Sequence, residues 1–332
     1  MGLSSPNTPT ERGFDFFHGF LGDMMDDYYT HLRGGRNFMR LNEAEIDPQG
    51  HATDLFTDWA IGYVRERARL AQPFFLYLAY NAPHTPIQPP QERLERTKAR
   101  QPELSAARAG LVALIEHMDD GIGRFVEALR ECGAAGNTLL IFTSDNGGQL
   151  SVGASNGDLN GGKGQMFEGG IRVPMFAVWP GRIEPGSKSD YIAMTMDLFP
   201  TVCEAAGAEG KRPLFEHAID GASFLPVLLG RAISGTPPGG SAAEGRTLVW
   251  VRRETGADCA LPYYAVRRGD WKLLQNGPFE KPALYDLASD PGEQAPLDSK
   301  HKNYRPLAKA LEAHVLRSGE TPWQAAGTWT AP

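Results

Sequence analysis

The sequence has few cysteines and no long hydrophobic run, and each absence excludes a class of protein. Three of the 332 residues are cysteine: Cys132, Cys203 and Cys259. They are scattered and odd in number, so they predict neither a disulfide framework nor a Cys-x-x-Cys metal pair. The longest apolar run, FFLYLAY, is far shorter than the roughly 20 residues that a membrane-spanning helix needs. We therefore expect no membrane partner.

Basic charge is also scarce. The chain has 33 lysines and arginines against 40 aspartates and glutamates, which gives a formal net charge of -7. A general nucleic-acid binder normally carries a basic patch, so we expect no nucleic-acid partner. The N-terminus MGLSSPNTPTERGFDFF has no basic segment followed by an apolar stretch, so no secretion signal is visible and the compartment stays unassigned. The hydrophobic content of 41% is typical of a globular protein.

Helical periodicity is clear in two long segments. Apolar residues at helical spacing predict a helix over residues 52–70, with Thr53 or Asp54 as its N-cap. The strongest pattern covers residues 109–132, where apolar residues recur every three or four positions and Gly133 suits the C-terminal cap. A shorter helix is expected before Gly207. These segments predict helices that flank a sheet.

Uniformly apolar runs predict buried strands between these helices. They are PFFLYLAY (73–80), TLLIF (138–142) and RVPMFAVWP (172–180). Strands that alternate with helices are typical of an α/β domain with a mostly parallel sheet.

The C-terminal part has a different pattern. A Pro/Gly/Ser-rich stretch covers residues 234–246, and the segments TLVWVRR and YYAVRRGDWKLLQN follow it. They predict antiparallel strands with a tight turn at RRGD, and a last helix is expected near residues 304–317. We therefore predict an α/β domain over residues 1–233. A C-terminal subdomain with a small antiparallel sheet and a terminal helix would cover 234–332.

Polar residues follow two of the predicted strands. His84 lies in NAPHTP after the first strand, and Asp145 and Asn146 lie in TSDNGG after the second. Sites in open α/β sheets form at the carboxyl ends of strands, so parallel neighbours would bring these side chains to one edge. The oxygens of Asp145 and Asn146 suit calcium or magnesium, but Asp-Asn-Gly-Gly is also good turn chemistry.

His84 and Lys163 have two interpretations each. His84 can donate a proton or contact an anion, or it can simply be hydrogen-bonded within its loop. Lys163 lies between glycines in NGGKGQMFEGGIRVP, where it can neutralise a tetrahedral oxyanion such as sulfate or phosphate. It can equally be a solvated lysine of a flexible loop. The spacing is not that of a phosphate-binding P-loop.

Together and in this order, these segments resemble the sulfatase family of the alkaline-phosphatase-like superfamily, and the resemblance covers nearly the whole chain. His84 and Lys163 match the family's sulfate-contacting histidine and lysine, and Asp145 and Asn146 match two of its calcium ligands. The resemblance implies a Ca²⁺ cofactor and catalytic, substrate-binding roles for His84 and Lys163. It also implies a sulfuric ester hydrolase that acts on a sulfated small molecule or glycan. Family members usually work in the periplasm, outside the cell or in lysosomes.

The sequence lacks several segments of the family pattern. Sulfatases carry a Cys-or-Ser-x-Pro-x-Arg motif, whose first residue becomes the formylglycine nucleophile, and an early pair of calcium-binding aspartates. No cysteine here matches the motif, and SSPNT has Thr8 where the arginine belongs. We therefore expect a C-terminal portion of a sulfatase that lacks the nucleophile. For residues 1–332 alone we predict weak calcium binding, little or no turnover, and exposed sheet edges and apolar surface.

Two other functions stay open from the sequence. A phosphodiesterase or phosphonate hydrolase of the same superfamily shares the fold and the metal chemistry. A non-catalytic remnant would bind an anion or a glycan without hydrolysing it.

Overall fold

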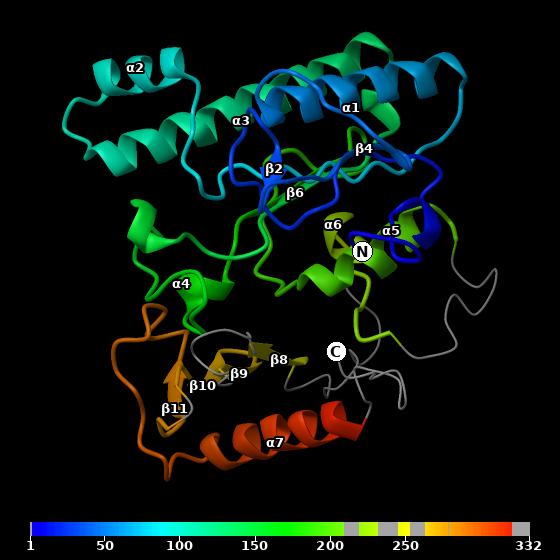
Figure 1. Cartoon of the computed structure of the whole chain (residues 1–332). Helices are drawn as coiled ribbons and strands as arrows, with labels where there is room; N and C mark the ends of the chain where they lie inside the picture. Colours follow the sequence, from blue (N-terminus) through cyan, green and yellow to red (C-terminus); the bar gives the residue numbers. More distant parts are fainter. Residues whose placement is uncertain (1, 209–218, 232–244, 253–262, 278, 321–332) are drawn as a thin grey trace, which may run out of the picture. The chain divides into compact units, whose positions relative to one another are not determined.

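The computed structural model describes residues 2–208, 219–231, 245–252, 263–277 and 279–320 (Figure 1). The chain divides into two compact units. The first consists of Met1–Leu139, Ser151–Ala154 and Trp179–Gly181, and the second of Leu140–Leu150, Ser155–Val178 and Arg182–Pro332. The predicted domain boundary between residues 233 and 234 lies outside the described residues.

Helices dominate the first unit. The helices are α1 (Ala52–Arg69), α2 (Gln91–Arg100) and α3 (Ala106–Glu131), with short 3-10 turns at Thr10–Arg12 and Ala135–Asn137. The long helix is confirmed: it begins after Ser105, whose hydroxyl accepts the N–H of Arg108 at 3.2 Å, and it ends before Gly133 at φ 74°. Helices α1 and α3 pack side by side (Figure 1).

The N-cap of α1 differs from the prediction. Neither Thr53 nor Asp54 caps the helix; the cap is His51, whose Nδ1 accepts the N–H of Thr53 at 3.2 Å. Residue preferences favour small oxygen-bearing side chains at this position. The buried imidazole takes it because the carbonyl of Gln88, 3.0 Å from Nε2, holds the ring in place. A contact with a residue distant in sequence therefore determines which residue caps the helix.

The strands of the first unit are short and antiparallel. β1 (His18–Phe20), β4 (Met39–Leu41) and β5 (Ala44–Glu45) form one sheet in the order β1-β4-β5, and β2 (Leu32–Arg33) pairs with β3 (Arg36–Asn37).

The predicted strand at residues 73–80 does not form a ladder. Its residues alternate between partial burial and exposure, as extended backbone does, but no described strand pairs with it. The residues Phe75 and Tyr77 are 58% and 63% exposed. A β-strand needs a neighbour that completes its hydrogen bonds, and an apolar run alone does not supply one.

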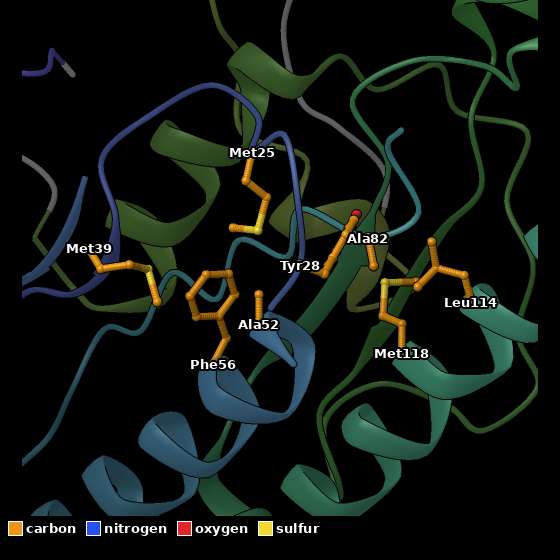
Figure 2. Packing of buried hydrophobic residues seen from close by; sticks show 8 residues of the cluster. All are labelled: Met25, Tyr28, Met39, Ala52, Phe56, Ala82, Leu114 and Met118. Atoms are coloured by element: carbon orange, nitrogen blue, oxygen red, sulfur yellow. The ribbon is translucent and has the colours of Figure 1, made fainter. Parts of the chain in front are cut away.

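The core of the first unit lies where α1 and α3 meet the loops that precede them. Figure 2 shows Met25, Met39 and Phe56 pointing toward one another, with Leu114 and Met118 entering from α3. Each of these side chains is at most 9% exposed. Removing apolar surface of this kind from water contributes about 25 cal/mol per Å², so this cluster holds the helix pair to the loop around residue 28.

One carboxylate in that loop makes the stability of the first unit depend on pH. Asp27 accepts hydrogen bonds from the side-chain amide of Gln88 and the N–H of Thr30, both at 2.7 Å. These bonds, the one from Gln88 foremost, lower the pKa of Asp27 to about 2. Its contribution to stability is therefore present above its unfolded pKa near 3.8 and is lost as the pH falls towards 2.

We expect Asp27→Asn to lower the free energy of unfolding at pH 6, because one amide N–H then faces other donors. The difference between the variant and the wild type should shrink as the pH falls from about 4 to about 2, when the native carboxyl is itself protonated. Urea unfolding across this pH range measures the difference. Asp15→Asn, at an exposed position, is the control. A difference that stays constant down to pH 2 would contradict the assignment.

The second unit contains the pair β6 (Leu140–Thr143) and β7 (Met175–Val178). The two strands are antiparallel, with Phe142 opposite Phe176. Every strand pair among the described residues is antiparallel, so the described part contains no parallel ladder of the expected kind. The second unit also contains the short helices α4 (Glu168–Ile171), α5 (Leu198–Ala205) and α6 (Leu225–Leu228) and a 3-10 turn at Thr195–Asp197, and a 3-10 turn at Leu150–Val152 has residues in both units. The expected helix before Gly207 is α5.

The C-terminal sheet is confirmed. β8 (Thr247–Arg252), β9 (Tyr263–Arg268), β10 (Trp271–Gln275) and β11 (Ala283–Asp286) form an antiparallel sheet in the order β11-β10-β9-β8. Gly269 at φ 57° and Asp270 form the predicted tight turn between β9 and β10. Helix α7 (Tyr304–Glu320) packs along this sheet (Figure 1) and buries Val266, Leu273 and Leu284 against Leu307 and Leu311.

No helix within the described ranges combines the length and the apolar character that crossing a bilayer requires.

Candidate functional site

Asp145 and Asn146 lie directly after β6. The carboxylate of Asp145 is exposed, and its Oδ1 accepts the N–H of Asn146 at 2.9 Å. The side-chain amide of Asn146 donates to the carbonyl of Gly147 at 3.0 Å. The backbone bends at Asp145 and Asn146, and the hydrogen bond from the adjacent N–H is not that of an Asx turn. The bend is compatible with a metal site, because it holds two oxygen-bearing side chains next to each other.

Glycines let this segment lie against the loop that carries Lys163. The N–H of Gly147 donates to the carbonyl of Gly170 at 2.9 Å, and the N–H of Lys163 donates to the carbonyl of Gly148 at 3.0 Å. A Cβ on Gly147 would lie only 1.8 Å from the carbonyl oxygen of Gly169. The backbones meet more closely than any side chain allows, so the two glycine-rich segments form one interlocked unit.

Asn156 holds the same two loops from the side. Its Oδ1 accepts the N–H of Gly148 at 2.8 Å, and its amide donates to the carbonyl of Gly161 at 2.9 Å. The sequence analysis missed Asn156. The one signal in the sequence was its position between the two glycine-rich segments.

A buried group of charges anchors the end of the Lys163 loop. The ammonium of Lys272 on β10 lies 2.9 Å from Oε1 of Glu168 and 2.8 Å from Oε1 of Glu293, and Arg267 lies 3.2 Å from Oε2 of Glu168. Both carboxylates and the lysine are at most 3% exposed. Burial raises the pKa of Glu293, and Lys272 opposes that rise.

The sequence analysis also missed this charged group. Its one local signal is a lysine inside the otherwise apolar strand Trp271–Gln275. A charge that is fully buried needs a partner, but the sequence does not say which carboxylate supplies it.

His84 lies in the first unit, in a loop that contains cis peptide bonds at Ala82-Pro83 and Thr85-Pro86. Its Nδ1 lies 2.9 Å from the carbonyl oxygen of Thr85, and its own carbonyl accepts the hydroxyl of Tyr28 at 2.9 Å. A carbonyl only accepts, so the proton is on Nδ1. The expectation that His84 and Asp145 share one sheet edge rested on parallel strands that the described residues do not contain. The structure thus brings together the segments of Asp145, Asn146 and Lys163.

The donors present suit a hard cation. Asp145 and Asn146 offer a carboxylate and an amide oxygen, the ligand types that Ca²⁺ prefers. Two residues supply only a minority of the six to eight oxygens that Ca²⁺ takes. The chemistry of the pair therefore fits calcium, and the remaining ligands would come from elsewhere.

Comparison with known proteins defines the class of this chain. Its fold is the alkaline-phosphatase-like fold: it superposes on the crystal structure of Ps i-CgsB in complex with k-i-k-neocarrahexaose with a TM-score of 0.83 and 28% identity. The match covers 99% of this chain and 72% of that one. The sequence profile of the sulfatase family matches residues 2–208, well over half of the chain. The chain therefore belongs to the sulfatase family.

Curated relatives agree with this assignment. N-acetylgalactosamine-6-sulfatase of Sus scrofa is 30% identical over 95% of this chain and 58% of its own length. The uncharacterized sulfatase YdeN of Escherichia coli is 35% identical over 66% of this chain and 37% of its own length. A second profile, N-sulphoglucosamine sulphohydrolase, C-terminal, matches residues 162–320. The chain spans about half the length of the curated relatives it matches.

Proposed function

We propose that this chain forms part of a calcium-dependent sulfatase that removes sulfate from a sulfated glycan. The observation that carries the proposal is the interlocking of two loops. Backbone hydrogen bonds at 2.9 and 3.0 Å hold the segment of Asp145 and Asn146 against the segment of Lys163. This supports the proposal because the oxygens suited to a metal and the ammonium suited to an oxyanion belong to two loops that are joined through their backbones.

Each residue has a role in the proposed reaction. Asp145 and Asn146 would hold Ca²⁺, which when bound neutralises charge on the sulfate oxygens. The ammonium of Lys163 would stabilise the charge that passes to the leaving oxygen. His84 would act as the imidazolium: its Nδ1 proton stays with the carbonyl of Thr85, and its Nε2 proton would pass to that oxygen, which leaves the neutral imidazole. The chain contains no Cys-x-Pro-x-Arg motif, so we infer that residues 1–332 alone turn over little or no sulfate ester.

The names of the relatives support the substrate class. One is named for a sulfated amino sugar, and the structure with a TM-score of 0.83 was solved with a carbohydrate. Both agree with a sulfated glycan as the substrate.

The first test reads the genomic DNA upstream of the Met1 codon and expresses the complete reading frame. We expect an in-frame Cys-or-Ser-x-Pro-x-Arg motif and release of 4-nitrophenol from 4-nitrophenyl sulfate that stops when EDTA removes calcium. A preference for the diester bis(4-nitrophenyl) phosphate would replace the sulfatase with a phosphodiesterase. An in-frame stop codon, together with glycan binding but no hydrolysis, would overturn the enzymatic proposal. Calcium-dependent turnover by residues 1–332 alone would contradict the inferred inactivity.

Lys163 provides a second test in the active polypeptide. We expect Lys163→Ala to lower kcat for 4-nitrophenyl sulfate by about a hundredfold, the usual effect of removing one group that stabilises transition-state charge. Lys188→Ala, at another exposed lysine of the same unit, should leave the rate unchanged. Equal rates in the two variants would remove Lys163 from the mechanism.

A further inference from the structure

A second group of candidate metal ligands lies in the first unit. His51 caps α1, Asp54 lies in the first turn of that helix, and His117 lies on α3. One ligand atom from each comes within 4.8 Å of the other two. None of the three belongs to the segments of Asp145, Asn146 or Lys163, and the inference below does not depend on the proposed sulfatase reaction.

The hydrogen bonds of His51 fix its tautomer. Nε2 lies 3.0 Å from the carbonyl oxygen of Gln88, and Nδ1 lies 3.2 Å from the N–H of Thr53. A carbonyl accepts and an N–H donates, so the proton is on Nε2 and the lone pair is on Nδ1. An ion bound at Nδ1 would replace the hydrogen bond from Thr53, while Nε2 would keep its hydrogen bond to Gln88, as in histidines that bind metals. The ring is also stacked on Tyr28, with centroids 4.9 Å apart.

His117 is buried beside Asp54. The residue is 7% exposed, and among the described residues neither ring nitrogen has a hydrogen-bond partner of good geometry. Its Nε2 nevertheless lies 3.2 Å from Oδ2 of Asp54. A buried polar group whose hydrogen bonds are poorly met costs stability, and a ligand shared with the carboxylate and the second imidazole would remove that cost.

We propose that His51, Asp54 and His117 bind a divalent transition-metal ion of the Zn²⁺ class. Two imidazole nitrogens and one carboxylate oxygen form a typical zinc donor set, whereas calcium takes oxygen ligands. Ligands at 2.0–2.1 Å in a tetrahedral site lie about 3.4 Å from one another. The 3.2 Å separation of His117 Nε2 and Asp54 Oδ2 already matches that spacing.

Closing the site from the present span of up to 4.8 Å requires movement of the imidazoles as well as of Asp54. Its side chain is 44% exposed, so its carboxylate can turn toward both imidazoles and the ion can enter from solvent. Arg124 contacts Asp54 at 3.2 Å in the present structure, and it keeps Asp58 at 2.7 Å if Asp54 turns to the metal. The bound ion would join the start of α1 to α3, so its role is structural.

Cobalt binding tests the site directly. Co²⁺ replaces Zn²⁺ in tetrahedral sites and gives visible absorption bands there, so tag-free protein stripped with EDTA is titrated with CoCl₂. We expect one tetrahedral ion per chain, displaced by Zn²⁺ and not by Ca²⁺, and a rise in Tm with Zn²⁺. Asp54→Asn and His117→Ala should each weaken binding by about 100-fold or more, beyond the 10–100-fold typical of a lost outer-shell partner. His314→Ala, on α7, is the matched control.

The outcomes separate a metal site from a purely structural pair of histidines. Asp54→Asn changes a half-exposed side chain with little change of shape, so it should fold even if His117→Ala does not; far-UV circular dichroism checks both. No tetrahedral cobalt spectrum in the wild type, or the same affinity in Asp54→Asn, would overturn the proposal. Displacement of cobalt by calcium at equal concentration would overturn the assignment to the zinc class.

Discussion

Replacing Lys272 with methionine is expected to lower the free energy of unfolding by about 3–5 kcal/mol, the usual cost of removing one partner of a buried ion pair. The methionine has a similar length and fills the same space. The carboxylates of Glu168 and Glu293, now 2.9 and 2.8 Å from the ammonium, would lose that partner, and Glu168 would keep Arg267 at 3.2 Å. Urea unfolding followed by tryptophan fluorescence measures the change.

Two further variants identify the cause of that loss. Lys300→Met, at an exposed lysine, should change stability by less than about 0.5 kcal/mol. Adding Glu293→Gln to Lys272→Met removes one uncompensated charge, so the two changes should couple by about 0.5–3 kcal/mol in the favourable direction. A cost below about 1 kcal/mol for Lys272→Met would show that the pair barely exceeds its desolvation cost.

The same variant should become less destabilised at low pH. Burial already raises the pKa of Glu293, and removal of Lys272 takes away the interaction that opposes this rise. A carboxyl whose folded pKa lies above its unfolded value holds its proton more tightly in the fold, so stability increases as the pH falls through the folded pKa. The loss measured at pH 8 should therefore exceed the loss measured at pH 5. Equal losses would exclude Glu293 as the uncompensated group.

Replacing Gly147 with alanine is expected to destabilise the second unit by more than about 3 kcal/mol, above the usual 1–3 kcal/mol for an overpacked site. The added methyl would lie 1.8 Å from the carbonyl oxygen of Gly169, and backbone atoms cannot turn away as a side chain does. The hydrogen bond from Gly147 to Gly170 would break. The segment of Asp145 and Asn146 would then separate from the Lys163 loop, so calcium affinity should fall with stability.

The control for Gly147→Ala is the same substitution in a helix. Gly123 lies on the exposed face of α3, and a methyl there would meet nothing within 4 Å. Gly123→Ala should stabilise the chain by about 0.5–1 kcal/mol, because alanine is the better helix former. Thermal unfolding compares the two variants, and calcium titration calorimetry follows the site. If Gly147→Ala unfolds at the same temperature as the wild type, the close contact of Gly147 with Gly169 does not hold the two loops together.

Much of the local structure could be predicted from the sequence, because local structure depends on neighbours along the chain. The apolar spacing of residues 109–132 predicts α3, and Gly133 marks its end. The segment RRGD predicts the hairpin of β9 and β10, since glycine takes the positive φ that such a turn needs. The order of the motifs around His84, Asp145 and Lys163 likewise identifies the family, which the match to residues 2–208 confirms.

Pairing and burial were decided by the tertiary structure, because they depend on residues far apart in sequence. The run at 73–80 has the composition of a strand, yet no described strand pairs with it, and β6 pairs with the antiparallel β7. The cap of α1 is His51 because Gln88 holds its ring. The contact of Lys272 with Glu168, and of His117 with Asp54, joins residues that no spacing relates. The sequence shows which charged and imidazole side chains would need a partner if they were buried. Which residue becomes the partner depends on the tertiary structure.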